Sequence, residues 1–417
     1  MKFSVYSFQF SVLCAVLLAV VLPANAQTEK WSSFLGPGGA SVSTTVLPKV
    51  IDEDTNVAWK VKLPAKGASS PIVVGDFVIT TCSGGIGEKK QDEMYVVCND
   101  LASGKELWRQ QFWATGRALC HSLSANAAPT PASDGQRIFA FFSSNDLACL
   151  DLEGNLLWYR GLAVDFPKAG NDVGMSSSPV HVDGVVVVQV ECQGDSFAMG
   201  LDATDGTTKW TQERGKKAVW SSPTVLRPRD GNNLVLLQSP DRINVVDPQT
   251  GEVKFEQEGA CSTISTACVV DDTVIVPLDG TSAFTITSDG KVEPKWSQAK
   301  IKSGSPSYQV NADTIFTCDS RGILKTYDRE TGEPKKEVRV GGKYWSTPII
   351  ADGHMYAFDQ TGELRIVNLH LDDDQAKPDV VHKVKFEDEV FLGSPAIAGN
   401  TMVMRSNRHL WKFEEKE

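Results

Sequence analysis

The chain has 417 residues, of which 41 are basic and 52 acidic, giving a formal net charge of −11. A surface with this acidic excess repels phosphate backbones, which excludes nucleic acid as a partner class. Composition does not shift along the chain and no Pro/Ser-rich linker interrupts it, so we expect a single domain over residues 27–417.

The first element in chain order is an export leader at residues 1–26. Met1 and Lys2 are followed by an unbroken apolar run at residues 12–22, then Pro23 and the small-x-small sequence at residues 24–26. This order is typical of a signal peptide. The run is 11 residues long, whereas a membrane span needs about 20. We therefore expect an exported protein, periplasmic or extracellular, that starts near Gln27 and keeps no integral membrane segment.

After the leader, one unit recurs along the whole chain. In its clearest copy Ser69, Ser70 and Pro71 precede the apolar residues 72–74 and a Gly-Asp turn. Counting the weaker copies at Ala128-Pro129, Thr266-Ala267 and Ser305-Pro306, eight positions start such a unit: Pro71, Pro129, Pro179, Pro223, Ala267, Pro306, Pro348 and Pro395. The starts span 324 residues in seven intervals, so the mean period of about 46 matches a propeller blade.

The second half of each unit combines an aspartate, a glycine turn and an aromatic residue. Four copies place the aromatic four residues past the glycine, at Trp108, Trp158, Trp210 and Phe255, whereas a fifth copy leads to Lys336. The aspartate can accept backbone N–H bonds and glycine can adopt the positive φ of a tight hairpin. We expect the aromatic side chains to cover the seams between adjacent blades.

Short β-branched runs such as residues 185–188 lie between these two signatures, and no long apolar pattern has a helical period. Four short strands per unit follow, which predicts an all-β, eight-bladed β-propeller of four-stranded antiparallel blades. The eighth unit ends before its outer strand. Residues 55–63, with Trp59 in the aromatic position, should complete that blade and close the ring.

These repeats resemble the PQQ-like repeat propellers, the superfamily that includes quinoprotein alcohol dehydrogenases and the outer-membrane assembly lipoprotein BamB. The opening segment, with Trp31, Phe34, Gly36 and Pro37, is similar to the Trp-x-x-Phe-Arg-Gly-Pro start of many secreted members, although Leu35 replaces the arginine. The resemblance implies the fold; it does not imply that each member holds the quinone.

The enzymes of this superfamily carry an adjacent Cys-Cys pair, a calcium site and a catalytic aspartate. No two cysteines are adjacent here, and no acidic residue can be matched by motif, so no catalytic residue is assigned and no cofactor is expected. The histidines form no His-x-x-x-His pair, no Cys-x-x-Cys occurs, and Asp372–Asp374 has the pattern of a solvated acidic loop, so no metal is expected. Cys261 and Cys268, the closest in sequence, are the best disulfide candidates.

A central funnel is the predicted place of function. Residues ahead of the repeat prolines and in the following hairpin turns should gather at one mouth of the channel: Trp220, Trp345, Asn126, Asn145, Asp241, Arg242, Arg321 and Arg408. Tryptophan, arginine and amide side chains could grip an envelope protein, a peptide or a polysaccharide. Alternatively, the two tryptophans only plug the ring. The favoured hypothesis is a non-catalytic binding or assembly scaffold; the alternative is a PQQ-dependent quinoprotein oxidoreductase.

Overall fold

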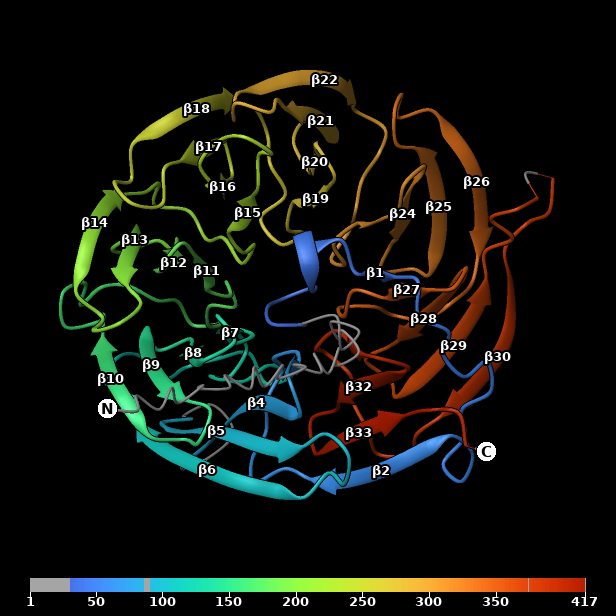
Figure 1. The fold of residues 1–417 in the computed structure, drawn as a ribbon, viewed down its shortest axis with the longest axis horizontal. Coiled ribbons are helices and arrows are strands. Elements are labelled where there is room, and N and C mark those ends of the chain that lie inside the picture. Colours follow the sequence, from blue (N-terminus) through green and yellow to red (C-terminus); the bar gives the residue numbers. More distant parts are fainter. Residues whose placement is uncertain (1–30, 86–90, 374, 417) are drawn as a thin grey trace, which may run out of the picture.

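Eight antiparallel sheets stand in a ring around a central axis in the computed structural model, which describes residues 31–85, 91–373 and 375–416 (Figure 1). Each sheet is a blade, and the chain passes through the blades in order around the ring. The prediction of an all-β, eight-bladed propeller is confirmed. The residues of the leader lie outside the described part of the chain.

The first four blades take their strands consecutively from the sequence. Their strands, from the axis outward, are β3 (Ile72–Val74), β4 (Phe77–Gly84), β5 (Glu93–Asp100) and β6 (Glu106–Trp113) in blade 1; β7 (Ala132–Ser133), β8 (Arg137–Phe141), β9 (Asp146–Asp151) and β10 (Leu156–Gly161) in blade 2; β11 (Val180–Val182), β12 (Val185–Val190), β13 (Phe197–Asp202) and β14 (Thr208–Glu213) in blade 3; β15 (Thr224–Leu226), β16 (Leu234–Ser239), β17 (Arg242–Val246) and β18 (Val253–Glu258) in blade 4.

The last four blades include the two strands that come from the amino-terminal region. Their strands are β19 (Cys268–Val270), β20 (Thr273–Val276), β21 (Thr281–Ile286) and β22 (Val292–Gln298) in blade 5; β23 (Gln309–Val310), β24 (Thr314–Cys318), β25 (Ile323–Asp328) and β26 (Pro334–Arg339) in blade 6; β27 (Ile349–Ala351), β28 (His354–Phe358), β29 (Glu363–Asn368) and β30 (Asp379–Lys385), with β1 (Val42–Ser43) added inside, in blade 7; β31 (Ala396–Ala398), β32 (Thr401–Arg405), β33 (His409–Phe413) and β2 (Val57–Lys62) in blade 8.

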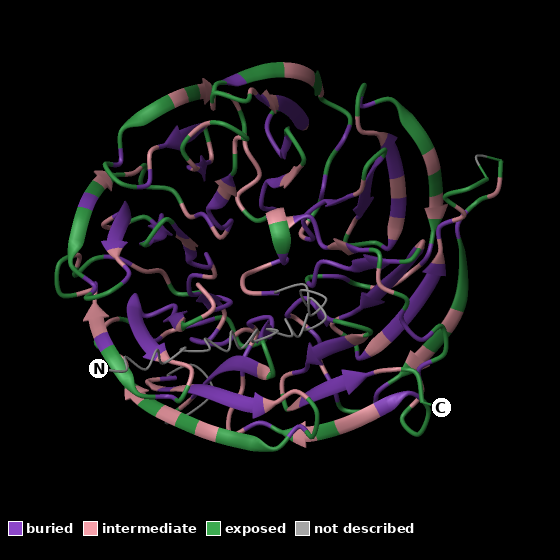
Figure 2. Cartoon of the chain, in the orientation of Figure 1, coloured by how far each residue is buried: buried purple, intermediate pink, exposed green. Residues whose placement is uncertain are grey.

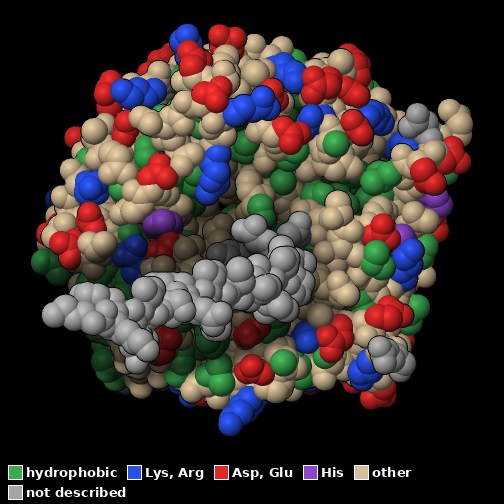
Figure 3. Space-filling model, viewed as in Figure 1, with side chains coloured by type: hydrophobic (Ala, Val, Ile, Leu, Met, Phe, Trp, Pro, Cys, Tyr) green, Lys and Arg blue, Asp and Glu red, His purple; other side chains and the backbone are tan. Residues whose placement is uncertain are grey.

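Burial follows the position of a strand in its blade (Figure 2). The middle strands are covered on both faces by neighbouring blades, so β12 is buried at every residue and apolar at every residue except Gln189. The outermost strand β6 alternates between exposed and half-buried residues, because one of its faces meets solvent. Charged side chains of both signs gather around the perimeter of the ring (Figure 3).

The seam between two blades is made by a tryptophan of one blade and the turn glycine of the next, as the repeat predicts. Trp210 of blade 3 packs on Gly251 of blade 4 and donates its Nε1–H to the carbonyl of Pro248 at 2.7 Å. The aspartate of that turn, Asp247, accepts the backbone N–H of Gln249 at 2.7 Å. Equivalent tryptophan-to-carbonyl bonds are made by Trp59, Trp108, Trp158 and Trp296.

The ring is closed by strand β2, as predicted. β2 pairs in antiparallel register with β33, with Lys60 opposite Trp411. The blue strand β2 and the red strand β33 therefore lie side by side in Figure 1. Trp59 then packs on Gly104 of blade 1. The last blade therefore has its outer strand and its seam only because residues from the other end of the chain supply them.

Two of the predicted repeat starts are wrong. The inner strands of blades 2 and 6 begin three residues after Pro129 and Pro306, whereas β3 begins one residue after Pro71, so both starts are out of register by two residues. Thr130 and Ser307 occupy the place that Ser70 has in blade 1. The candidate bridge between Cys261 and Cys268 is not formed, and both are free thiols. Burial raises the pKa of Cys268 to about 12, as expected for a cysteine that acts as a small apolar core residue.

No helix in the described part of the chain is long and apolar enough to span a membrane. Within residues 31–85, 91–373 and 375–416, the one helical element is the short 3-10 segment η1 (Pro37–Gly39), which lies near the centre of the ring in Figure 1.

Candidate functional site

A belt of eight hydroxyl groups surrounds the central channel, one from the start of each inner strand. The backbone N–H of Ser70 donates to Oγ1 of Thr130 at 2.9 Å, and the same bond repeats from each blade to the next, until Ser394 donates to Oγ of Ser70 at 2.8 Å. The belt consists of Ser70, Thr130, Ser178, Ser222, Thr266, Ser307, Thr347 and Ser394. The eight bonds form a complete ring, so the belt ties all blades together at the axis.

The belt hydroxyls are buried and keep an unused donor. Each belt residue is at most 4% exposed, and all eight line the same cavity. Each oxygen accepts one backbone N–H, but none of the eight O–H groups donates to an acceptor among the described residues. A buried hydroxyl normally uses its donor. Eight donors that no described residue accepts therefore surround this cavity.

A second ring, the collar, lies two residues before the belt in each blade. It consists of Ala68, Ala128, Ser176, Trp220, Ile264, Ser305, Trp345 and Leu392, all of which line the cavity. The indole of Trp220 is held by a bond from its Nε1–H to the carbonyl of Gly174 at 2.9 Å. Trp345 is 41% exposed, with its ring centroid 5.9 Å from that of His121. The collar gives the mouth of the channel an aromatic and aliphatic lining.

The other face of the channel is crossed by an amino-terminal strap, residues 31–43. Trp31 pairs with Val73 of blade 1, the Ser32 carbonyl accepts the N–H of Ser133 in blade 2, and β1 pairs in parallel with β27 of blade 7. Phe34 lines both the cavity at the collar and a second hollow on the strap side. The channel is therefore a cup of about 430 Å³, with its mouth at the collar and Phe34 toward the strap.

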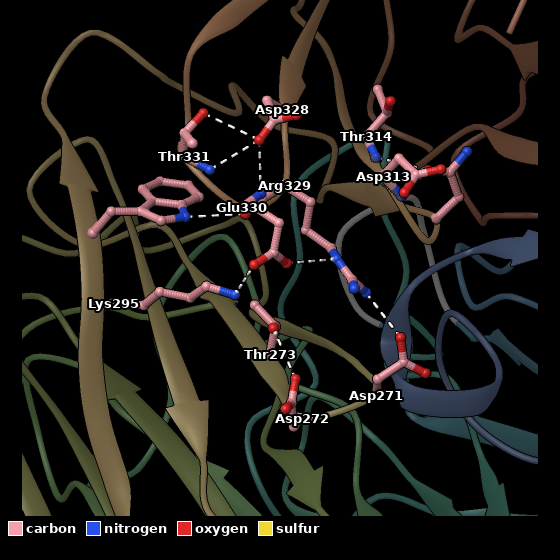
Figure 4. A network of polar contacts seen from close by, with 12 residues as sticks. Asp271, Asp272, Thr273, Lys295, Asp313, Thr314, Asp328, Arg329, Glu330 and Thr331 are labelled. Atoms are coloured by element: carbon pink, nitrogen blue, oxygen red, sulfur yellow. Dashed lines mark hydrogen bonds and ion pairs between the residues drawn. The ribbon is translucent and has the colours of Figure 1, made fainter.

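The hollow on the strap side differs in chemistry. It has a volume of about 510 Å³ and is lined in part by Asp134, His181 and Asp271. Its carboxylates are paired: Asp134 with Arg137 at 2.7 Å, and Asp271 with Arg329 at 3.0 Å (Figure 4). Arg329 lies in the turn of blade 6, so this second pair joins neighbouring blades. These ion pairs tie both carboxylates into the framework, and the hollow is also lined by Arg227 and by His181, whose Nε2 has no hydrogen-bond partner among the described residues.

The cup, by contrast, carries no Asp, Glu, Lys or Arg side chain among its described lining residues. His121 is the one titratable group there, and its Nδ1 accepts the backbone N–H of Leu123 at 3.2 Å. General acid–base catalysis needs a positioned acid and base, and nucleophilic catalysis needs a nucleophile beside an activating base. The lining offers hydroxyl, aromatic and aliphatic groups for binding, without such a pair.

Of the residues predicted from the sequence, Trp220 and Trp345 both line the cup. Asn126 does not line the cup. The prediction set the start of blade 2 two residues too early, and Ala128 occupies the collar position instead. The side-chain amide of Asn126 is fully buried and donates to the carbonyl of Gln91 at 3.0 Å. Asn145 is also fully buried.

The charged candidates lie in hairpin turns outside the cup lining. Asp241 and Arg242 pair with each other at 3.3 Å, Arg321 pairs with Asp319 at 2.7 Å, and Arg408 is exposed beside β33. The belt residues were not among the predicted site residues, although a Ser or Thr directly precedes most repeat prolines in the sequence.

The lining does not fit pyrroloquinoline quinone with calcium. That quinone carries three carboxylates, and the described cup residues include no cationic side chain to meet them. No group of three or more His, Cys, Asp and Glu side chains in the described ranges is placed to hold a metal ion. Calcium requires several oxygen ligands, usually including carboxylates.

The fold and the repeats define this chain as an eight-bladed propeller of the PQQ-like class. Residues 32–158 and 92–292 match the family described as outer membrane protein assembly factor BamB, and the chain belongs to that family. No curated protein matches the sequence.

Solved structures agree on the fold. BamB from Moraxella catarrhalis has a TM-score of 0.64 at 16% identity, covering 87% of this chain and 98% of that one. Quinohemoprotein alcohol dehydrogenase from Comamonas testosteroni has a TM-score of 0.65 at 11% identity, covering 93% of this chain and 81% of that one. A europium-containing methanol dehydrogenase has a TM-score of 0.64 at 10% identity, with 93% and 98% coverage. At these identities the similarity concerns the fold alone.

Proposed function

We propose that this protein is an exported, non-catalytic scaffold that holds an uncharged part of an envelope partner in its central cup. The observation that carries the proposal is the lining of the cup: its described residues include eight hydroxyls whose donors have no acceptor among them, two tryptophans at the mouth and no Asp, Glu, Lys or Arg. Concave sites with an apolar lining and a few polar groups are the usual places for ligands.

Two further observations support a binding role. Three large apolar residues at the mouth are exposed, Val173 at 44%, Ile264 at 48% and Trp345 at 41%, and exposed apolar clusters at a concave site mark interaction surfaces. The family description names an assembly factor of the outer membrane, which favours a partner in the cell envelope. A PQQ-dependent oxidoreductase is the alternative; it is supported by the shared fold and opposed by the uncharged lining.

The test is a pull-down from envelope extracts with three forms of the mature protein. The variant Trp220→Ala/Trp345→Ala removes both collar tryptophans, and Trp113→Ala removes a tryptophan that is 60% exposed on the outer strand β6. We expect the native protein and Trp113→Ala to recover the same partner, and the double variant to lose it while melting at nearly the native temperature. Retention of every partner by a folded double variant would remove the cup from consideration.

The oxidoreductase alternative has its own assay. Adding the quinone and calcium to the purified chain and measuring alcohol-dependent dye reduction should give no turnover. Sustained turnover that requires the quinone would replace the scaffold proposal.

A further inference from the structure

We infer that the ligand of the cup is the end of a neutral saccharide. This inference rests on the proposed binding role and names the chemistry that the cup recognises. It is carried by the belt, the collar tryptophans and the closed strap side, taken together.

The belt hydroxyls match the hydrogen-bonding character of a sugar. Each belt oxygen has two lone pairs and one hydrogen; one lone pair accepts the backbone N–H of the adjacent blade, so one donor and one acceptor position are left. A saccharide also presents groups that both donate and accept. Belt residues such as Ser178 and Ser222 line the cup, and no described residue accepts a hydrogen bond from their hydroxyls, so the acceptor oxygens of a ligand can take these donors.

The two collar tryptophans provide flat apolar surfaces at the mouth. The Nε1–H of Trp220 is already bonded to the carbonyl of Gly174, so the indole is held in place and offers its apolar face. Trp345 lies in the same lining beside His121. A pyranose ring has an apolar C–H face, which packs on an indole, and a rim of hydroxyls, which bond to polar side chains. The collar and the belt thus address the two different surfaces of one sugar ring.

The absence of charged side chains in the described lining favours neutral saccharides over anionic ones. An anionic polysaccharide would bring carboxylate or sulfate groups into a cavity with no cationic partner, at a large desolvation cost. Cleavage of a glycosidic bond usually needs two carboxyl side chains flanking that bond, and the described cup residues provide none. The cup should therefore bind a neutral saccharide without hydrolysing it.

The strap sets the mode of binding. Because residues 31–43 cross one side of the channel and Phe34 borders the cup there, a long chain cannot pass through the ring from one face to the other. A volume of about 430 Å³ is within the range of about 300–1,000 Å³ that is typical of small-molecule sites. A polysaccharide must enter by an end, so affinity should not grow with chain length once the cup is filled.

The experiment measures binding by isothermal titration calorimetry on the mature chain. The probes are neutral oligosaccharides built from glucose, galactose, mannose, xylose or N-acetylglucosamine, each as a short and a long chain, with oligogalacturonate as the anionic comparison. We expect at least one neutral series to bind with an affinity that is the same, within about threefold, for the short and the long chain. Failure of every neutral series, or tighter binding of oligogalacturonate, would overturn the inference.

Four variants locate the binding. Trp345→Ala and Thr347→Val, which removes a belt hydroxyl at similar volume, should each weaken binding by at least about tenfold. Thr347→Ser keeps the hydroxyl and should restore binding. Ser221→Ala is the matched control, because the Ser221 hydroxyl is buried, has no partner in the described chain and lies outside the cup lining. Native affinity in both Trp345→Ala and Thr347→Val would place the sugar elsewhere and overturn the inference.

The saccharide inference and the scaffold proposal can fail separately. If a partner protein is recovered through the collar tryptophans and excess neutral oligosaccharide does not displace it, the scaffold stands and the saccharide inference falls. If saccharide binding depends on the cup while the double tryptophan variant keeps every protein partner, the cup is a sugar site and the protein-scaffold part is wrong.

Discussion

The substitution Gly251→Ala tests how tightly the blades are fitted to one another. Gly251 has a φ of +74°, and a Cβ atom there would stand 2.7 Å from Cδ2 of Trp210 in the preceding blade. Gly184 has nearly the same backbone conformation, with a φ of +76°, but a Cβ atom there would meet nothing within 4 Å. The two glycines therefore separate the cost of the backbone conformation from the cost of the seam.

The expected magnitudes follow from these contacts. Placing alanine at a positive φ costs about 1–2 kcal/mol, which is the whole loss expected for Gly184→Ala. At Gly251 the new methyl group also overpacks the seam, which costs about 1–3 kcal/mol more. If the indole moves away to relieve the overlap, its 2.7 Å bond to the Pro248 carbonyl is lost as well, at about 1 kcal/mol.

The assay is urea denaturation of Gly251→Ala, Gly184→Ala and Trp210→Ala, together with the double variants Trp210→Ala/Gly251→Ala and Trp210→Ala/Gly184→Ala. Without the indole the methyl group has room, so the two substitutions should be non-additive by about 1–3 kcal/mol. Gly184→Ala, combined with Trp210→Ala, should be additive, because the structure places nothing near that Cβ. Equal losses for the two glycines, or additivity of the Trp210–Gly251 pair, would show that the seam is not packed as described.

The remaining predictions concern closure, the belt, acid and metal. Deleting residues 27–63 should lower the melting temperature of the whole ring, since blade 8 loses its outer strand, and an unchanged melting temperature would contradict closure by β2. Ser222→Ala should lower the free energy of unfolding by about 1–2 kcal/mol, because it removes the acceptor of the Ser178 N–H, whereas Ser221→Ala should leave it nearly unchanged. Equal losses for the two variants would contradict the structural role of the belt. Burial raises the pKa of Asp359, but hydrogen bonds from Glu363, Thr361 and Arg365 outweigh this effect and leave the pKa lowered. Its contribution to stability should therefore be present above pH about 4 and be lost as the pH falls through the folded-state pKa. Asp359→Asn should make stability less dependent on pH in the acid range, and an unchanged dependence would refute the assignment. Exhaustive chelation should leave the melting temperature unchanged, and a large fall would reveal a metal site.

The seams and the closing strand could be predicted because their signals are local in the sequence. A tryptophan four residues past a turn glycine recurs at Trp108, Trp158 and Trp210, and each of these packs on the next blade. The two slipped starts have a physical reason. Blade 2 contains prolines at both 129 and 131, and blade 6 has Pro306 one residue before its belt serine, so proline alone does not define the register. The register is defined by the hydrogen bond from each belt N–H to the hydroxyl of the next blade, and the sequence of a single repeat does not reveal that bond.

The candidate site was only partly predictable for a similar reason. Trp220 and Trp345 were found because they precede well-marked repeat prolines, and both line the cup. The turn residues, such as Arg321 between β24 and β25, lie outside the cup lining, because they belong to hairpins that join the second and third strands of a blade, farther from the axis than the start of its inner strand. The strap could not be placed from sequence, since its path depends on contacts with blades distant in the chain, such as that of β1 with β27.

Site-specific photo-cross-linking can show whether partners are held in the cup. A photoreactive side chain at Ile264, which is 48% exposed in the collar, is compared with one at Val253, which is 45% exposed on the outermost strand β18. With envelope extract as the source of partners, we expect a cross-linked product from position 264 and none from position 253. A product from position 253 alone would contradict it and place the binding surface on the perimeter of the ring.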